Sequence, residues 1–414
     1  LEMKIFDANL KIIKDSRGKD TLEAELKSGE FSAIASVPAG KSTGTHEAFV
    51  LEPKKAIEKF EEIKNKILGK DFDNQEEFDN FLINLDGTSN KNSLGGNLIL
   101  ALSLAFARLK AKSENLELFK YISEVSSIKY QALRFPRPIF NVINGGAHAA
   151  HPESKLEIQE FQVIPQVDDF GVAFSVGKIF YRKLGDYLRE KFGAENVVLG
   201  DEAGYSAPFK NNEEALDCLA EVIEKYKYPL RIGLDVAASQ FYRSNQESVN
   251  NNQEFYEINN KKYNADELKE YYLKLIETYN IISIEDPFYE ESFDDFAVLS
   301  DGIAKNKKEF LIITDDLTTT NPERLKTAIE KKSGNAILIK LNQIGTLTKT
   351  LKVVKMAYEN NWQAVVSHRS GETMDNFIAD LAVGINAWGI KAGAPAKPER
   401  LVKYNRLLEI VGKI

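Results

Sequence analysis

The sequence predicts an α/β protein whose N-terminal third mixes strands with helices and whose remainder forms a closed αβ barrel. Short apolar, β-branched runs recur after residue 138, each ends in polar or charged residues, and helical patterns lie between them. From Asp235 onward the closing residues are 50, 30, 25, 28 and 23 positions apart. The later intervals fit one strand, one helix and two loops. Five or more such units in succession favour a closed barrel over an open doubly wound sheet.

Length and composition suit this architecture. An αβ barrel takes about 250 residues, and a chain of 414 residues leaves room for a second domain. An apolar share of 43% and a charged share of 28% are typical of a globular protein with a buried core. The net charge of −8 and the pI near 5.4 argue against a basic surface, so no nucleic-acid partner is expected.

The single cysteine, Cys218, excludes an internal disulfide framework and a thiolate zinc site, and it suits a reducing compartment. The longest apolar run, residues 98–107, falls short of the roughly 18 residues that a membrane-spanning helix needs. Leu1 and Glu2 before Met3 resemble a cloning remnant, and no signal-peptide pattern follows them. We therefore expect a cytoplasmic protein without a membrane span.

The N-terminal third predicts a β-hairpin followed by three helices. Alternating polarity marks the two strands on either side of a turn at residues 28–30, and a helical apolar period marks each helix. Gly69 is expected to end the first helix. The predicted ranges are strands 21–26 and 31–37 and helices 56–68, 74–82 and 98–109. Because the last helix is mostly apolar, it is predicted to be buried.

The remainder predicts seven barrel strands. Parallel strands that are buried on both faces read as continuous apolar runs, as these do. The strand ranges are 139–143, 232–235, 281–285, 311–315, 336–340, 364–368 and 389–391, and clear helical patterns occupy 268–279, 322–332 and 347–360. The segment from 139 to 233 fits the regular strand–helix interval poorly.

The closing residues of these strands form a candidate active site, because the carboxyl ends of barrel strands converge on one face. They are Asp235, Glu285, Asp315, Lys340, His368 and Lys391. One Asp after a strand is usually the N-cap of the next helix, but three carboxylates across a narrow mouth would repel one another. A hard divalent cation removes that repulsion, and oxygen ligands without thiolates favour Mg²⁺ or Mn²⁺ over zinc.

Together these groups indicate proton abstraction next to a carboxylate. A lysine beside a metal ion and a second ammonium has a lowered pKa and can act as a base near neutral pH. A metal that binds a carboxylate substrate stabilises the additional charge of the enediolate that forms.

Two other motifs suggest different chemistry, but each departs from the pattern that this chemistry requires. Residues 40–43 resemble the end of a nucleotide-binding P-loop, but Ala35 stands where that pattern requires glycine. His148 and His151 could form half of a zinc site, but Pro152 disfavours a helical presentation and no third ligand has matching spacing.

Eight ordered motifs resemble the enolase family, the phosphopyruvate hydratases of glycolysis. The resemblance runs from about residue 15 to residue 408, which is almost the whole chain. The motifs are Asn-Val-Ile-Asn-Gly-Gly-Ala-His at 141–148, Gln-Glu-Phe at 159–161, Gly-Asp-Glu-Ala-Gly at 200–204, Ser-Ile-Glu-Asp-Pro at 283–287, Asp-Asp-Leu at 315–317, Lys-Leu-Asn-Gln-Ile-Gly at 340–345, Ser-His-Arg-Ser-Gly-Glu at 367–372 and Lys-Ala-Gly-Ala-Pro at 391–395.

This resemblance implies an N-terminal α+β cap domain, residues 1–128, and an enolase-type αβ (TIM-like) barrel, residues 129–414, whose first strands depart from regular alternation. It implies the Mg²⁺-dependent, reversible dehydration of 2-phosphoglycerate to phosphoenolpyruvate. It also implies a homodimer or a higher homo-oligomer. The expected binding partner is a small phosphorylated substrate.

The same resemblance assigns the metal ligands. Asp235, Glu285 and Asp315 would hold the first Mg²⁺, which chelates the substrate carboxylate. Ser42, on a loop of the cap, would meet a second Mg²⁺ that binds with the substrate and contacts its phosphate.

The resemblance assigns the proton-transfer groups as well. Lys340 would take the C2 proton, and Glu202, working with Glu160, would assist departure of the C3 hydroxyl as water. His368 belongs to the same catalytic set. A lysine base with Mg²⁺ stabilising the enediolate is the known chemistry of enolase-type sites, so this pairing follows from the resemblance itself.

The substrate contacts complete the assignment. Arg369 and Ser370 would bind the phosphate, since an arginine fork suits a phosphate better than a lysine does. Lys391 would bind the carboxylate, and His148 would close over the substrate, which Glu160 also contacts.

Several local sequences depart from the family pattern. Lys41 adds a cation beside the second metal site, the loop 148–160 is about three residues longer, Ala203 replaces a usual Gly and Gln240 a usual Glu. None replaces a residue with an assigned chemical role. The altered loops leave open a related phosphorylated or phosphonate 2-hydroxy acid as substrate, and a non-catalytic binding protein of the same fold is a further alternative.

Overall fold

The structure is a computed structural model that describes residues 3–41, 46–128, 133–244, 254–304 and 309–413. Its N-terminal part contains a three-stranded antiparallel sheet of β2 (Asp7–Lys14), β3 (Asp20–Ser28) and β4 (Phe31–Ser36). Strands β3 and β4 confirm the predicted hairpin. Strand β2 was not predicted, because only Ala8 and Leu10 alternate clearly as buried residues within it.

Four helices pack with this sheet to form the cap. They are α1 (Pro53–Ile67), α2 (Gln75–Asp86), α3 (Gly96–Ser113) and α4 (Leu118–Ser126), and a two-residue pair of β1 (Met3–Lys4) and β5 (Asp71–Phe72) joins them. The first three confirm the predicted helices. The side chain of Asn74 caps α2 by accepting the backbone N–H of Glu77 at 3.0 Å, which explains the predicted start of that helix. Helix α3 is buried along almost its whole length, as predicted.

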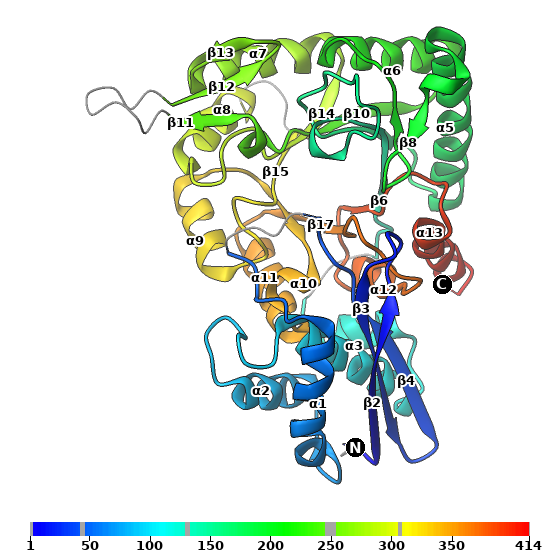
Figure 1. Cartoon of the computed structure of the whole chain (residues 1–414), viewed down its shortest axis with the longest axis vertical. Helices are drawn as coiled ribbons and strands as arrows, with labels where there is room; N and C mark the ends of the chain where they lie inside the picture. Colours follow the sequence, from blue (N-terminus) through cyan, green and yellow to red (C-terminus); the bar gives the residue numbers. More distant parts are fainter. Residues whose placement is uncertain (1–2, 42–45, 129–132, 245–253, 305–308, 414) are drawn as a thin grey trace.

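Eight strands close into a barrel above the cap (Figure 1). In chain order they are β6 (Arg137–Asn144), β7 (Glu160–Pro165), β10 (Leu230–Asp235), β14 (Ile281–Glu285), β15 (Leu311–Thr314), β16 (Ala336–Ile339), β17 (Gln363–Ser367) and β18 (Gly389–Lys391). Pairing of β18 with β6 closes the ring. Strand β7 runs antiparallel to both β6 and β10, whereas the later neighbours are parallel. The expected α/β barrel with irregular first strands is therefore confirmed.

The seven predicted barrel strands are all present, but the sequence pattern did not predict β7. Buried positions in β7 include Glu160 and Gln162, and these polar residues interrupt the apolar run by which the other strands were found. Glu160 lines the polar cavity at the barrel mouth and Gln162 donates to its carboxylate at 2.9 Å, so these buried polar groups serve that cavity and not the apolar core.

Helices surround the barrel, and short strands lie in the segments that connect its elements (Figure 1). The helices are α5 (Phe170–Phe192), α6 (Asn212–Tyr226), α7 (Ala265–Thr278), α8 (Phe293–Ala304), α9 (Pro322–Lys331), α10 (Leu341–Ile344), α11 (Leu347–Glu359), α12 (Phe377–Gly384) and α13 (Pro398–Val411). The short strands are β8 (Val198–Leu199), β9 (Tyr205–Ser206), β11 (Tyr242–Ser244), β12 (Glu254–Ile258) and β13 (Lys261–Tyr263). Helices α7, α9 and α11 confirm the three predicted between the later strands.

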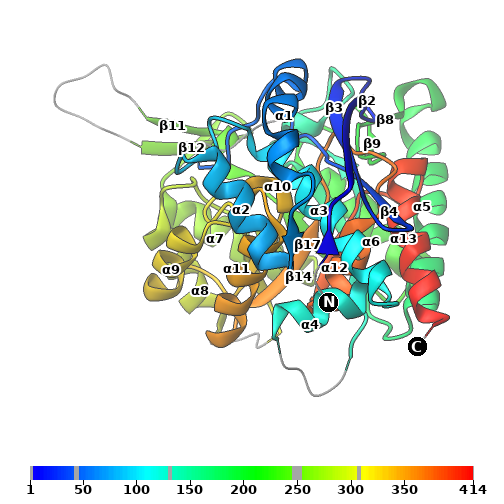
Figure 2. The same cartoon turned by 90° about the horizontal axis from the view of Figure 1, so that it is seen from below.

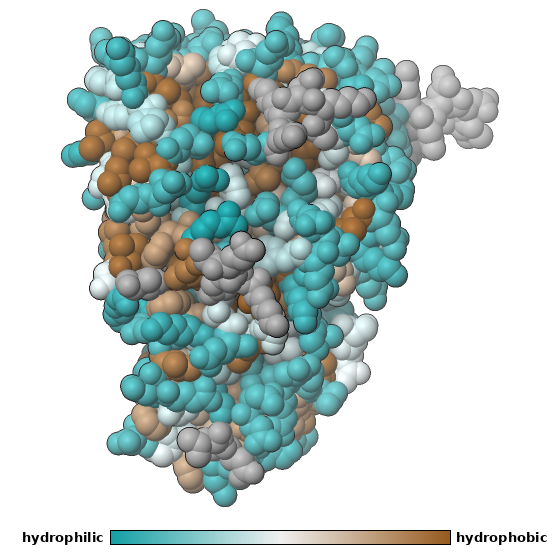
Figure 3. Space-filling model, turned by 180° about the vertical axis from the view of Figure 1, so that it is seen from behind, coloured by the Kyte–Doolittle hydropathy of each residue, from teal (hydrophilic) through white to brown (hydrophobic). Residues whose placement is uncertain are grey.

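Two apolar layers stabilise this arrangement. A small cluster fills the barrel interior, and a large one lies between the strands, the surrounding helices and the cap. The interior cluster consists of Ile139, Ile164, Ile282, Leu311, Ile313, Ala336, Leu338 and Val365. On the face shown in Figure 3, hydrophilic side chains predominate and apolar ones form small groups. Among helices of the described residues, none has the length and apolarity to cross a bilayer.

The cap lies across the barrel when the molecule is viewed from the cap side (Figure 2). Several ion pairs join the two parts, and in one of them Arg108 of α3 contacts both oxygens of Asp375, at 2.6 and 2.8 Å. The carboxylate also accepts the backbone N–H groups of Ser36 and Phe377. Burial alone would raise the pKa of Asp375, but the charge and hydrogen bonds of Arg108 lower it. Asp375 therefore contributes stability above the ordinary Asp pKa, and this contribution is lost as the pH falls through its lower folded value.

We expect Arg108→Ala to lower the free energy of unfolding by about 3 kcal/mol near pH 7, because it leaves a buried carboxylate without its counter-charge. The loss should shrink below the ordinary Asp pKa of about 3.9, where protonation removes the stranded charge. Urea unfolding at pH 7 and at about pH 3.5 measures both effects. A loss of equal size at both pH values would show that Arg108 acts through packing on the Phe377 ring, which lies 5.5 Å away.

Candidate active site

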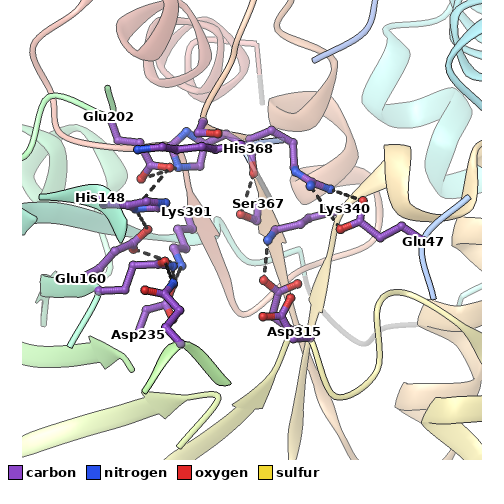
Figure 4. Close-up of a pocket in the computed structure, with 16 residues that line it drawn as sticks. Glu47, His148, Glu160, Glu202, Asp235, Asp315, Lys340, Ser367, His368 and Lys391 are labelled. Atoms are coloured by element: carbon purple, nitrogen blue, oxygen red, sulfur yellow. Dashed lines mark hydrogen bonds and ion pairs between the residues drawn. The ribbon is translucent and has the colours of Figure 1, made fainter. Parts of the chain in front are cut away.

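A polar cavity at the carboxyl ends of the barrel strands contains most of the predicted site (Figure 4). Ten predicted residues line it: His148, Glu160, Glu202, Asp235, Asp315, Lys340, His368, Arg369, Ser370 and Lys391. Glu285 is buried beside them and contacts Lys391. Ser42 lies outside the described residues. The structure thus brings together residues that extend along the chain from position 148 to position 391.

Strand register places three carboxylates in a row. Asp235, the last residue of β10, pairs with Glu160 of β7 on one side and with Glu285 of β14 on the other. The ammonium of Lys391 lies 2.7 Å from Asp235, 2.9 Å from Glu285 and 3.1 Å from Glu160. Burial and the neighbouring Asp235 raise the pKa of Glu285 well above its usual value, and these carboxylates in turn raise the pKa of Lys391 despite its burial. Positive charge is therefore strongly favoured at this point.

Asp315 and Lys340 form the opposite side of the cavity. The lysine ammonium contacts Asp315 directly, and Gln343 donates to the other carboxylate oxygen at 3.0 Å. Burial would lower the pKa of Lys340, but Asp315 raises it above the usual value, while Arg369 and Lys391 act to lower it. Without a bound cation the nearest charge to Lys340 is a carboxylate, so the lowered pKa expected beside a metal ion stays a prediction.

The metal-ligand hypothesis fits the donor chemistry of these residues. Asp235, Glu285 and Asp315 are all buried, come from neighbouring strands and offer only oxygen, which a hard divalent cation prefers. In the structure they are divided between two lysines, with Asp235 and Glu285 on Lys391 and Asp315 on Lys340. Within the described residues, ligand atoms lie within 4.8 Å of one another in the groups His148–Glu160–Glu202 and Asp286–Asp315–Asp316.

A second acidic pair, Glu160 and Glu202, lies beside two histidines. Nε2 of His368 lies 3.4 Å from Glu202, Asn141 donates to it at 3.0 Å, and Nδ1 of His148 lies 3.4 Å from Glu160. Burial, Glu202 and Asp235 raise the pKa of Glu160, although Lys391 opposes this. Burial would also raise the pKa of Glu202, but the two imidazoles hold it well below its usual value. Two carboxylates whose pKa values differ in this way suit an acid–base pair.

The loop that carries Glu202 contains a strained residue. Ala203 is fully buried and has φ of 67°, in the left-handed region that favours glycine. The Tyr181 hydroxyl donates to its carbonyl at 2.6 Å, and its N–H donates to the carbonyl of Gly200 at 3.1 Å. These bonds keep the backbone in this conformation in spite of the methyl group.

We expect Ala203→Gly to raise the free energy of unfolding by about 1 kcal/mol, since glycine adopts positive φ without the steric cost that alanine meets. Urea unfolding measures the change. The matched control is Ala207→Gly, at a buried alanine without positive φ, which should be destabilising. Equal destabilisation by both substitutions would contradict strain at Ala203.

The predicted phosphate-binding residues are held by the cap. Arg369 pairs with both carboxylate oxygens of Glu47, at 2.9 and 3.2 Å, and also donates to Asn342 at 3.1 Å. The Ser370 hydroxyl accepts a hydrogen bond from Arg17 at 3.2 Å. Neither Glu47 nor Arg17 was among the predicted site residues. Their position beside the loop of Lys41 and at the start of the family resemblance was the available signal.

Arg400, in the first turn of α13, was also missed. It is fully buried, contacts Nδ1 of His368 at 2.5 Å and donates to the carbonyls of Arg369 and Ser370 at 2.7 and 2.6 Å. Because arginine only donates, Nδ1 must accept, and the ring proton of neutral His368 lies on Nε2, toward Glu202. Burial lowers the pKa of His368 to about 4, so the ring is neutral near pH 7.

Comparison with known proteins agrees with this architecture. Residues 5–122 match the family model described as enolase, N-terminal domain, and residues 132–414 match that of the enolase C-terminal TIM barrel domain. The chain is 41% identical to the enolase of Methanocaldococcus jannaschii, an alignment that covers 98% of this chain and 95% of the relative. It is 42% identical to the enolase of Methanococcoides burtonii, with 96% and 92% covered, and 41% identical to that of Sulfurisphaera tokodaii, with 96% and 93% covered. The chain belongs to the enolase family.

Proposed function

We propose that this chain catalyses the reversible, Mg²⁺-dependent dehydration of 2-phosphoglycerate to phosphoenolpyruvate. Members of its family are phosphopyruvate hydratases, which are hydro-lyases. The observation that carries the proposal is that Lys340 and the Glu160–Glu202 pair lie on opposite sides of the same polar cavity (Figure 4). Such a site can remove a proton from one carbon and assist loss of hydroxide from the next.

Asp235, Glu285 and Asp315 are the proposed ligands of the first Mg²⁺, and a second ion would bind with substrate near Ser42. When bound, these ions supply positive charge that stabilises the substrate carboxylate and the enediolate formed from it. The row of carboxylates is the supporting observation, since its repulsion is offset by Lys391 in the structure.

Lys340 is the proposed base. Its Nζ would take the C2 proton of the substrate, which requires the neutral amine. Asp315 now favours the charged amine, whereas Arg369 and Lys391 disfavour it. Engagement of Asp315 as a metal ligand would leave the two cations as the dominant influence and so lower the pKa of Lys340.

Glu202 and Glu160 are the proposed groups for the second step. The raised pKa of Glu160 favours a proton on this pair, which can pass to the departing C3 hydroxyl. His368 would fix Glu202 through its Nε2 proton, and His148 would lie over the substrate beside both acids.

Substrate anions would be bound on the remaining sides. The planar guanidinium of Arg369, already held by Glu47, suits a bidentate phosphate contact, and Ser370 offers a hydroxyl beside it. Lys391 would bind the substrate carboxylate after releasing part of its contact with the acidic row.

We further propose a cap of residues 1–128, a barrel of residues 129–414, a homodimer and a cytoplasmic location. The boundary is supported by the two family matches, which end at 122 and begin at 132. The dimer rests on the family resemblance, and the location rests on the single cysteine, which suits a reducing compartment.

The direct test adds Mg²⁺ and 2-phosphoglycerate to the protein and follows the ultraviolet absorbance of the enol product. Absorbance should rise, and chelation of the metal with EDTA should stop it until Mg²⁺ is restored. No product at any pH or metal concentration would contradict the proposal. In that case a panel of phosphorylated and phosphonate 2-hydroxy acids would test a different substrate, and tight metal binding without any turnover would indicate a non-catalytic protein.

A further inference from the structure

A hydrogen-bond chain runs from the cap loop to Asp235. The ammonium of Lys41 donates to the carbonyl of Ala147 at 2.8 Å, and the N–H of Ala147 donates to Oε1 of Gln240 at 2.9 Å. The Gln240 amide then donates to Oε1 of Gln159. Finally, Nε2 of Gln159 donates to Oδ2 of Asp235 at 3.4 Å. Three of these residues line the active-site cavity together with Asp235: Lys41, Gln159 and Gln240.

The direction of this chain is fixed by its ends. A backbone N–H can only donate, so Gln240 must present its oxygen to Ala147 and its NH₂ group to Gln159. Gln159 must then accept with its oxygen and present its own NH₂ group to Asp235. An ionised carboxylate can only accept, so every member of the chain is satisfied in this direction alone.

The surrounding backbone is shaped to admit the chain. A Cβ atom at Gly146 would lie 2.9 Å from the carbonyl oxygen of Glu157 and 3.0 Å from Oε1 of Gln240, so a side chain there would crowd both groups. On the cap side, Arg17 donates to the carbonyls of Ala39 and Gly40 at 3.0 and 3.4 Å. The Lys41 side chain therefore extends from a stretch of backbone that Arg17 already holds in place.

Two members of the chain are positions at which the sequence departs from the family pattern. Lys41 stands in a loop that usually has small residues, and Gln240 stands where a glutamate is usual. A glutamate at 240 could accept from Ala147 but could not donate to Gln159. The direction of the chain toward Asp235 thus depends on the glutamine at position 240.

We propose that Gln240 and Lys41 are positioning residues that raise the affinity of Asp235 for a divalent cation. Gln240 orients the Gln159 amide so that it holds the Asp235 carboxylate, and Lys41 ties the turn of Ala147 to the cap loop. Groups that orient a metal ligand typically change metal affinity by about 10–100-fold. The inference rests on the proposed function in one respect, which is that it takes Asp235 as a metal ligand.

The test is a titration with Mn²⁺ alone, without substrate, in which free Mn²⁺ is followed by electron paramagnetic resonance. Gln240→Met should weaken Mn²⁺ binding about tenfold. Lys41→Met should weaken it less, about threefold, because Lys41 acts one step further from the ligand and because loss of its ammonium also removes a charge that repels the cation. Lys41→Arg should restore the wild-type affinity. The double variant should bind no more weakly than Gln240→Met alone, since both act through one chain.

The matched control is Lys112→Met, which removes a similar ammonium-to-carbonyl bond, to Ser32 at 2.7 Å, remote from the cavity. It should leave Mn²⁺ affinity unchanged. Equal affinity of wild type and Gln240→Met, or additive losses in the double variant, would overturn the proposal. Because the titration involves no turnover, a wild type that binds Mn²⁺ but forms no enol product would count against the proposed function and not against this coupling.

Discussion

Lys340→Ala is expected to abolish exchange of the C2 proton of 2-phosphoglycerate with solvent and to lower turnover by about 10³–10⁴-fold, near the upper range for loss of a general base. Lys340 is the residue of the cavity that combines a partly buried amine with a direct carboxylate partner in Asp315 and two nearby cations, Arg369 and Lys391. Proton exchange can be followed by NMR in D₂O with Mg²⁺ present, and dehydration by the absorbance of the product.

The informative companion is Lys340→Arg. A guanidinium keeps the positive charge beside Asp315 but cannot give up its proton near neutral pH, so it cannot act as a base. We expect this variant to retain the stability that the ion pair confers and to be as inactive in exchange as Lys340→Ala. Substantial exchange by Lys340→Arg would show that the side chain acts as a charge, and the base would then have to be sought elsewhere in the cavity.

Much of the fold was predictable because the barrel strands carry a local signal. Apolar, β-branched runs such as 281–285 and 336–340 satisfy burial on both faces, and the polar residue that ends each run marks the open end of the barrel. Strand β7 lacks that signal, since Glu160 and Gln162 place polar groups on buried positions. The same polar residues that make β7 part of the site therefore interrupt the hydrophobic pattern by which a strand is predicted.

Ten residues that line the candidate site were predicted from the sequence, but their pairings were not. Glu47 and Arg369 are 322 positions apart, and Lys391 and Asp235 are 156 positions apart. Such contacts depend on strand register and on how the cap lies on the barrel, neither of which is written in a local pattern. The pKa of Lys340 shows the consequence, because its direction is decided by which charged group is nearest.

Glu202→Gln should separate the two halves of the reaction. The variant is isosteric and keeps an oxygen that can accept from Asn141 and His368, so the cavity should retain its shape. Because Lys340 and Asp315 are unchanged, exchange of the C2 proton should continue. Dehydration should fall by about 10²–10⁴-fold, since the amide cannot share or transfer the proton that the departing hydroxyl needs.

The matched control is Asp201→Asn, at the neighbouring exposed residue, whose carbonyl and not its side chain contacts Lys397 and Arg400. Both exchange and dehydration should continue in this variant. If Glu202→Gln lost exchange and dehydration equally while Mn²⁺ binding stayed intact, Glu202 would be needed for carbon deprotonation itself. Lys340 could then no longer be the sole base, and the division of the cavity into a proton-abstracting side and a hydroxyl-releasing side would be wrong.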